Sequence, residues 1–392
     1  MSASANPDIV DDGLVFLYDT DDGKSYKGEP TTNLISGVAN PNLSISGWYS
    51  NGWNGSISVD TDEGALVLNA TNGWRSMSYD FGVTNGTVTV QFDYKLKSAE
   101  HTNIYMVVLN GTHLGSYTQY LDGSLYPSLT EYKTYKKTFT TTTDSKICIV
   151  LRGTDNAGLT DEMFVKNLQV EQKSHATPFV NGTRSATQGL LDRTGNSTID
   201  ISNASFDSNA QMTFDGTDDD IDVGTGTSTS YQRTIEMVFK TNSLTSYTPL
   251  ACYTRGGGQS VVSGKRMWLG FQSNKFQMHG WGTNDPASTT TIQTGKYYHA
   301  VYAYDQTTKK HYIWINGSLE NNATNDQSGF TGWNSSGDHK WFVGGDPDHA
   351  SWFASAGRSL NGEIPIFKVY DKILSNEEVL QNYNAIKSRF GL

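Results

Sequence analysis

The chain has 392 residues, a formal net charge of −11 and 18% charged residues. This length exceeds one ordinary core and predicts two domains of roughly 150–200 residues each. The negative charge, with no local cluster of lysine and arginine, argues against a nucleic-acid partner. The first residues lack a basic and an apolar region, and no run of 18 apolar residues occurs, so we expect neither a secretory signal nor a membrane-spanning helix.

Glycine, threonine, serine, asparagine, tyrosine and tryptophan are frequent, which favours short strands joined by tight turns. We therefore predict an all-β chain of two antiparallel β-sandwich (jelly-roll) domains, with one short helix at the C-terminus. Cys148 and Cys252 lie far apart in apolar stretches, which predicts two buried free thiols.

Alternating segments come in two series along the chain. The first, over residues 33–175, contains ALVLNA, TVTVQFDYKLK, NIYMVVLNG, YKKTFTTTT, KICIVLRG and FVKNLQVEQ. Residues 176–185 have the composition of a connector. The second series, over residues 186–392, contains QMTFDG, RTIEMVFKT, RMWLGFQ, KFQMHGWG, YYHAVYAYDQ, HYIWINGSL, KWFVGGD and GEIPIFKVYD. This order predicts two antiparallel sandwiches.

The end of the chain has the pattern of a helix. Ser375 and Glu378 have the spacing of a capping box, and Gly391 follows the last apolar position. An apolar stripe of Val379, Leu380, Tyr383 and Ile386 should pack on the second sandwich.

The final segment, LNGEIPIFKVYDKILSNEEVLQNYNAIKSRFGL, resembles the closing strand and helix of laminin-G-like, concanavalin A-like domains in bacteriophage structural proteins. FDGTDDDIDVG, YYHAVYAYDQTTKKHYIWINGSL and FVGGD resemble internal strands of that family, in the same order. The resemblance covers roughly residues 186–392 and implies a concanavalin A-like sandwich.

Residues 1–32 contain DIVDDGLVFLYDTDDGKSYKG, which resembles the opening strand of the same family. In that family the strand runs directly into a segment like GLLDRTGN, found here only at residues 189–196. We therefore predict that residues 33–175 are an inserted domain, because insertions are tolerated where the two ends lie close together. GLVFLYDT should then pair with IPIFKVYDK.

The inserted block, from TTNLISG to FVKNLQVEQ, resembles carbohydrate-binding jelly rolls of the galactose-binding-like kind. Many such modules have an aspartate beside the asparagine of the last strand that helps to hold calcium, whereas Lys166 precedes Asn167 here. VEQKSHATPFVNGTR resembles a junction in tail and virion proteins of marine and cyanobacterial phages, which implies a virion protein.

Tryptophan and tyrosine faces stack on sugar rings, so their placement bears on function. Trp268 and Trp314 lie in alternating strands and should be core, and Trp341 is undecided. Loop-like stretches carry the other aromatic residues, which either face a sugar or cap a small core. These glycan-binding candidates are Trp48, Tyr49, Trp53, Trp74, Trp281, Trp333 and Trp352.

Asp215, Asp218 and Asp219 form an acidic turn whose oxygens suit calcium, and the alternative is a solvated turn without an ion. A looser cluster of His339, Asp346, Asp348 and His349 suits zinc or another divalent ion, or is simply exposed. No certain cofactor follows. No strand carries the E-x-D-x-E pair of a glucanase, so we expect no enzymatic activity.

Together these features predict a bacteriophage virion surface protein, as a head decoration, fibre or tail appendage, that is made in the host cytoplasm and contacts host surface polysaccharide and other virion proteins. A second hypothesis is a purely structural capsid or tail decoration protein whose sandwiches mediate subunit contacts, since a lectin-like fold does not imply sugar binding. A polysaccharide depolymerase is the third. The sequence leaves homo-oligomer formation open.

Overall fold

The computed structural model describes residues 8–35, 43–51, 55–71, 74–83, 85–101, 103–112, 116–141, 146–153, 158–224, 232–244, 247–254, 267–280, 285–322, 339–347 and 359–392. Within these ranges the chain forms two compact units. Unit 1 comprises residues 1–29, 186–207 and 211–392, and unit 2 comprises residues 30–185 and 208–210. The fold is nearly all β, as predicted.

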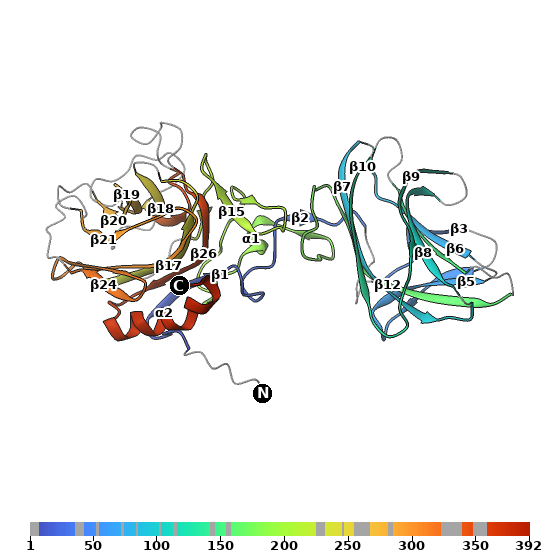
Figure 1. Cartoon of the computed structure of the whole chain (residues 1–392), viewed down its shortest axis with the longest axis horizontal. Coiled ribbons are helices and arrows are strands. Elements are labelled where there is room, and N and C mark those ends of the chain that lie inside the picture. Colours follow the sequence, from blue (N-terminus) through green and yellow to red (C-terminus); the bar gives the residue numbers. More distant parts are fainter. Residues whose placement is uncertain are drawn as a thin grey trace. The chain divides into compact units, whose positions relative to one another are not determined.

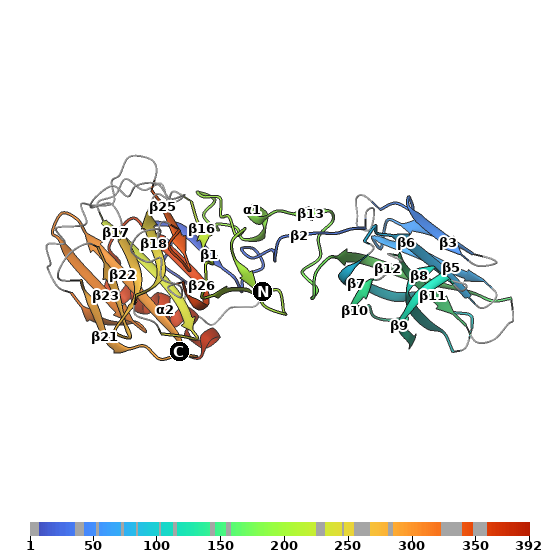
Figure 2. The same ribbon diagram turned by 90° about the horizontal axis from the view of Figure 1, so that it is seen from above.

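Unit 1 is a sandwich of two antiparallel sheets, whose layers are visible in Figures 1 and 2. The eight-stranded sheet contains β14 (Ser205–Phe206), β15 (Met212–Asp215), β26 (Asn361–Tyr370), β17 (Gln232–Thr241), β22 (Tyr297–Asp305), β23 (Lys310–Ile315) and β24 (Ser318–Asn321), with β1 (Leu14–Asp19) paired to β26. The six-stranded sheet contains β16 (Ile221–Asp222), β25 (Lys340–Val343), β18 (Thr248–Thr254), β19 (Met267–Gln272), β20 (Lys275–His279) and β21 (Ala287–Thr291).

The core of unit 1 lies between these two sheets. Met237 and Phe239 on β17 alternate inward and pack against Leu269 on β19 and Met278 on β20, all fully buried. This alternation explains why RTIEMVFKT and RMWLGFQ read as strands in the sequence. The two faces turned away from this core carry the features described below.

The opening strand of unit 1 comes from the N-terminus. β1 pairs antiparallel with β26, with Tyr18 opposite Phe367, so the predicted pairing of GLVFLYDT with IPIFKVYDK is confirmed. The chain then leaves unit 1 after Glu29 and returns at α1 (Ala186–Gly189).

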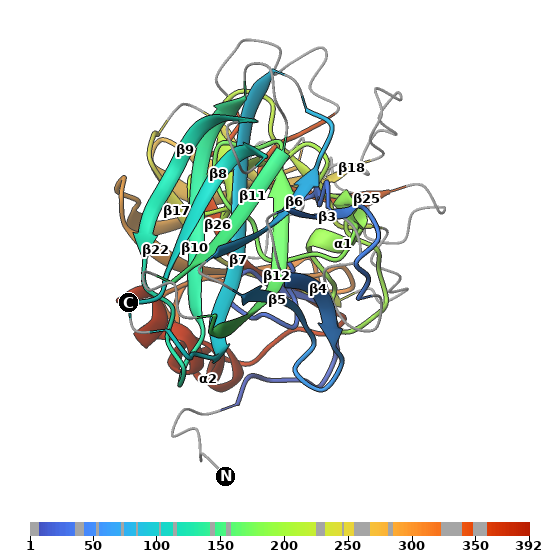
Figure 3. The same ribbon diagram turned by 90° about the vertical axis from the view of Figure 1, so that its right-hand side faces the viewer.

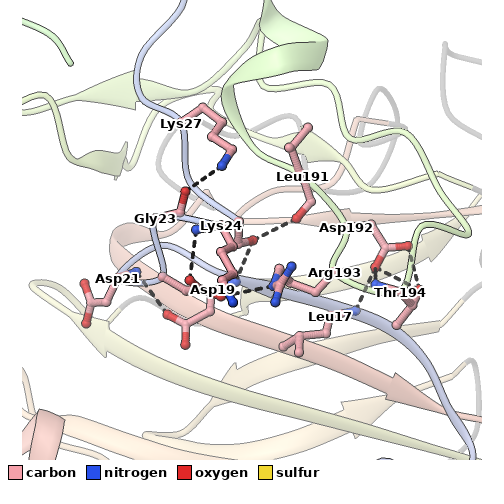
Figure 4. Close-up of polar contacts among 12 residues, drawn as sticks. Leu17, Asp19, Asp21, Gly23, Lys24, Lys27, Leu191, Asp192, Arg193 and Thr194 are labelled. Carbon is pink, nitrogen blue, oxygen red and sulfur yellow. Dashed lines mark hydrogen bonds and ion pairs between the residues drawn. The ribbon is translucent and has the colours of Figure 1, made fainter. Parts of the chain in front are cut away.

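Hydrogen bonds join the segment in which the chain leaves unit 1 to the segment in which it returns. Several of them are drawn in Figure 4. The Asp192 carboxylate accepts hydrogen bonds from the backbone N–H groups of Leu17 and of Thr194 in its own turn. The Arg193 side chain donates a hydrogen bond to Asp22. The backbone N–H groups of Lys27 and Gly28 both donate to Gly189. The exit and return of the chain are therefore adjacent, which is what an insertion requires.

Helix α2 (Asn376–Phe390) covers the outer face of the eight-stranded sheet (Figure 1). The predicted capping box is present, since Ser375 accepts from the backbone of Glu378 and the Glu378 carboxylate accepts from the backbone of Ser375. Gly391 closes the helix in the left-handed conformation, at φ 65°.

Unit 2 is a second sandwich. One sheet contains β10 (Lys133–Thr141), β7 (Gly86–Ser98), β12 (Thr160–Glu171), β5 (Ala65–Thr71) and β4 (Gly55–Asp60). The other contains β3 (Trp48–Asn51), β6 (Trp74–Asp80), β11 (Lys146–Arg152), β8 (Tyr105–Thr112) and β9 (Ser116–Leu125). Figure 3 shows the second sheet with its strands in the order β9, β8, β11, β6, β3. The core of unit 2 lies between its two sheets and includes Phe92, Met106, Ile149 and Val165.

The segment VEQKSHATPFVNGTR folds back on the end of β12. The buried carboxylate of Glu171 accepts hydrogen bonds from Thr31, Gln169 and the backbone and hydroxyl of Thr177. β2 (Thr31–Thr32) pairs with β13 (Thr183–Arg184) and brings the ends of unit 2 together. Residues 176–185, predicted as a connector, are thus tied by hydrogen bonds to the body of unit 2.

Two further sequence predictions can be compared with the structure. Cys148 and Cys252 are buried free thiols, as predicted. Among the described residues, no helix has the length and apolar character needed to cross a membrane.

Candidate functional site

The stretch SGWYSNGW, predicted as a loop, contributes strand β3, and alternation along this strand separates its two aromatic residues. Trp48 pairs with Tyr79 and packs in the core at 8% exposure, with the ring centroids 5.2 Å apart. Tyr49 pairs with Ser78 on the opposite face and is 60% exposed. Because successive strand residues face opposite sides, Trp48 belongs to the core and Tyr49 to the surface. Of the two alternatives for Trp48, a sugar-facing ring and a core residue, the structure shows the core residue, so Trp48 is no longer a glycan-binding candidate.

Tyr49 is one end of a row that crosses the whole sheet. Cross-strand pairing runs from Tyr49 through Ser78, Cys148 and Leu109 to Tyr120. The three central side chains are at most 2% exposed, whereas Tyr120 is 57% exposed. Four strand spacings separate the two tyrosines, which is about 19 Å along the sheet. We call the side of this sheet that carries the row the outer face of unit 2.

Two more aromatic positions lie on the outer face. The register places Trp74 of β6 and Tyr105 of β8 on either side of Arg152 on β11. Tyr105 is half-buried and packs on the apolar side chains Val107 and Val150. The backbone position of Trp74 is described, but its side chain is not. The face therefore combines exposed tyrosine rings with polar groups, the combination that binds sugar rings.

Several predicted site residues cannot be placed. Trp53, Trp281, Trp333 and Trp352 lie outside the described residues. Trp281 follows the end of β20 at His279 by two positions.

A second aromatic cluster occurs in unit 1, on the side of the six-stranded sheet away from its core. Trp268 pairs with Cys252 and His279, while its neighbours Met267 and Leu269 face the core. The ring of Tyr247 lies 6.3 Å from Trp268 and 6.3 Å from His279. Trp268 is buried at 2% exposure, as predicted, but on the outer side of the sheet.

Polar side chains border this cluster. Gln272 donates to the Tyr247 hydroxyl, at 2.7 Å, and His279 bonds Asp285. Tyr247, His279 and Gln272 were not predictable as members of this cluster, because single polar or aromatic residues in or beside alternating strands carry no distinctive pattern. The available signal was the alternation along β19, in which the core residues Met267 and Leu269 flank Trp268 and place it on the outer side of the sheet. By contrast, Trp314 is 1% exposed under α2 and donates to Asn376, and Trp341 is a core residue.

The predicted acidic cluster is formed in space. One carboxylate oxygen from each of Asp215, Asp218 and Asp219 lies within 4.8 Å of the others. Asp219 is buried and accepts from the backbone of Asp215 and the hydroxyl of Ser205, and burial raises its pKa. Asp215 and Asp218 are exposed. Asp219 thus organises the turn through protein donors, and calcium binding stays a prediction.

The other metal hypotheses have less support. His339 and Asp346 are buried, and Asp348 and His349 lie outside the described residues. In unit 2, the Lys166 ammonium lies 3.6 Å from Glu63 and 3.7 Å from the centre of the Tyr132 ring. The residue before Asn167, where the resemblance implies an aspartate in many modules, is thus a lysine that pairs with Glu63.

Glu236 of β17 forms a fully buried polar network that does not reach the surface. It accepts from Lys368 of β26 at 2.7 Å, and its second oxygen accepts from Asn382 of α2 at 2.6 Å. His299 lies 3.1 Å from the same carboxylate. Burial alone would raise the pKa of Glu236, but Lys368 and His299 overcome it and hold the pKa at about 2. This network attaches α2 to the sheet.

One family model matches part of unit 1. Residues 215–380 match the laminin G-like family model described as the concanavalin A-like lectin/glucanases superfamily. The match covers part of unit 1 and agrees with the resemblance of the final segment to that family. No curated protein matches the chain.

Solved structures show distant likeness. The CBM40 domain of a Ruminococcus gnavus sialidase, bound to α2,3-sialyllactose, has 18% identity and a TM-score of 0.32 over 38% of this chain and 81% of its own. Domain 4 of the Geobacillus stearothermophilus arabinanase AbnA, with arabinotriose, has 17% identity and a TM-score of 0.36 over 51% and 93%. Trypanosoma rangeli sialidase, with sialic acid, has 12% identity and a TM-score of 0.36 over 84% and 62%.

Proposed function

We propose that this protein is a glycan-binding surface protein of a bacteriophage particle that contacts host polysaccharide through the outer face of unit 2. The row from Tyr49 to Tyr120 carries the proposal, because it presents exposed rings at both edges of one sheet. Each ring offers an apolar face for a pyranose and a hydroxyl for hydrogen bonding. The particle assignment rests on the resemblance of the closing segment and of VEQKSHATPFVNGTR to phage virion proteins.

The proposed role is binding without catalysis. Glycoside hydrolysis by most families needs two carboxylates about 5–9.5 Å apart across the scissile bond. Among the described positions of the outer face in β3, β6, β8 and β11, Asp80 is the one carboxylate, and it stands opposite Lys146 in the register. Single-site binding would be weak, and many copies on a particle would strengthen it.

The first test compares binding of the full chain and of two variants, Tyr49→Ala and Tyr120→Ala, to a panel of host surface polysaccharides by affinity gel electrophoresis. We expect each variant to bind about five- to tenfold more weakly, because a stacking ring is lost, which is about 1–1.4 kcal/mol. Leu380→Ala, which removes an exposed apolar side chain from α2 of unit 1, should bind like the unchanged protein.

Two results would decide against the proposal. Equal binding by all four proteins would move the glycan site away from the outer face. Absence of binding to every polysaccharide, together with burial of Tyr49 and Tyr120 against a neighbouring subunit in a reconstruction of the particle, would favour the purely structural role.

A further inference from the structure

A pocket of about 400 Å³ opens in unit 2 beside the short β2 and β13 pair. Its lining residues lie within residues 30–34, 172–173 and 183–184, so unit 2 forms it alone. The volume falls in the range of about 300–1,000 Å³ that is usual for small-ligand pockets. None of the lining residues lies on the sheet that carries the outer face, so the pocket is a separate candidate site.

Two threonine hydroxyls border the pocket side by side. Thr32 and Thr183 stand opposite each other in the antiparallel pair, both are exposed, and their hydroxyl oxygens lie 3.2 Å apart. One proton lies between these two oxygens, which leaves the other proton and the remaining lone pairs for a ligand. The pair therefore offers a donor and an acceptor at neighbouring positions.

The residues next to this pair are bonded to the body of unit 2. Thr31 donates to the buried carboxylate of Glu171 at 2.7 Å. Arg184 donates to the carbonyl oxygen of Pro178 at 3.2 Å. The backbone that carries the two hydroxyls is thus held on both strands, and a site fixed in advance loses less conformational entropy when a ligand binds.

The rest of the lining combines apolar carbon with an amide. Pro30 and Leu34 are half-buried, and Leu34 packs against the core of unit 2. Gln172 is exposed and offers both an N–H donor and a carbonyl acceptor. A pyranose has the matching composition, because its ring carries hydroxyl groups at the edge and C–H bonds on each face.

We propose that this pocket is a second sugar site, which takes the terminal hexose unit of a glycan chain. The Thr32 and Thr183 hydroxyls bind two neighbouring sugar hydroxyls, which lie at a similar spacing and likewise both donate and accept. Pro30 and Leu34 contact the C–H face of the same unit. A pocket encloses one unit, whereas a sheet surface contacts a chain along its length. The inference goes beyond the proposed function, because it uses no residue of the outer face.

The test titrates the full chain with free glucose, galactose and mannose and follows its threonine methyl signals by nuclear magnetic resonance. We expect at least one of these sugars to shift the signals of Thr32 and Thr183 in a saturable way. The signals of Thr71 and Thr160, whose hydroxyl oxygens also lie 3.2 Å apart across a strand pair but outside the pocket, should stay in place.

Thr32→Val and Thr183→Val each remove one hydroxyl and keep the β-branched shape of the side chain. Each should weaken binding of the sugar about three- to tenfold, which corresponds to the loss of one neutral hydrogen bond. The matched control is Thr160→Val, which removes a hydroxyl from the equivalent pair of β12 and β5. The control should bind like the unchanged protein, and circular dichroism should show all three variants folded.

The outcomes separate this inference from the function proposed for the outer face. If no sugar shifts the Thr32 and Thr183 signals, or if Thr160→Val weakens binding as much as Thr32→Val, the pocket is not a sugar site, and polysaccharide binding by the outer face is unaffected. If a sugar binds in the pocket while Tyr49→Ala and Tyr120→Ala bind polysaccharide like the unchanged protein, the outer face fails as the glycan site and the pocket stands.

Discussion

Glu236 illustrates what pattern analysis at the level of single residues cannot predict. In the sequence it is one charged residue in RTIEMVFKT, and Lys368 is one in IPIFKVYD, 132 positions away. Only the pairing of β17 with β26 brings the two together, and only α2 removes both from water. Without that long-range register, a charged residue in a strand is expected to face solvent.

Replacing Glu236 with glutamine should destabilise unit 1 by about 3–5 kcal/mol at neutral pH, because a buried ammonium loses its carboxylate. The folded-state pKa of Glu236 is about 2, below the ordinary 4.5, so the ionised carboxylate favours the folded state. Its contribution is fully present above pH 4.5 and is lost as the pH falls toward 2. The difference between the two proteins should therefore shrink across that window.

Urea unfolding followed by hydrogen exchange in unit 1 peptides measures this difference at neutral pH and in acid. The control is Asp22→Asn, which breaks a half-exposed pair with Arg193 and should cost less than about 1 kcal/mol. Equal stability of Glu236→Gln and the unchanged protein at neutral pH would contradict a stabilising role for the network.

The aromatic candidates show a second limit of prediction from the sequence at the scale of single residues. SGWYSNGW was grouped as a loop by its glycines and serines, and a loop gives no rule for which ring is buried. Once β3 is known to start at Trp48, alternation assigns Trp48 to the core and Tyr49 to the surface. The register that adds Tyr105, Tyr120 and Arg152 to the same face comes from pairings between distant strands and is not contained in local patterns.

Among the elements, α2 was the most predictable. Its start and end depend on local chemistry, the capping box and the glycine, and both are found at the predicted residues. Its apolar stripe was only partly correct: Val379 and Ile386 are buried, but Leu380 is 46% exposed. Asn382 takes a fully buried position instead, because Glu236 needs a donor there.

Ser375→Ala should destabilise unit 1 by about 1 kcal/mol, because the backbone N–H of Glu378 loses its acceptor. Hydrogen exchange in the first turn of α2 should rise correspondingly. Ser318→Ala, at an exposed position on β24, serves as the control and should change stability by less than about 0.5 kcal/mol. Unchanged exchange in α2 would show that packing on the sheet, rather than the cap, determines where the helix begins.

At the scale of the whole molecule, the sequence predicted the interrupted sandwich from the separation of two segments that are normally contiguous. The pairing of β1 with β26 agrees with that prediction. The contacts that make the interruption tolerable were not predictable, since Asp192 and Gly189 receive backbone N–H groups from residues more than 150 positions earlier. Loop chemistry of this kind becomes visible only in three dimensions.

Replacing residues 30–185 with about four glycine or serine residues should leave unit 1 folded, because Gly28 and Gly189 are already joined by a hydrogen bond. Near-ultraviolet circular dichroism and thermal unfolding of the shortened chain provide the measurement. Deleting residues 8–29 instead should unfold unit 1, because β1 is lost from β26. A shortened chain that aggregates would mean that unit 1 needs unit 2 in order to fold.

The block of residues 30–185 in unit 2 is joined to unit 1 by two peptide segments, one that precedes β2 and one that follows β13. A domain appended at a terminus depends on one covalent link, and one protease cut releases it. Here a single cut in either of the two segments leaves unit 2 attached through the other segment. In any setting that contains proteases, the surface proposed to bind glycans would be shed only after two separate cleavages.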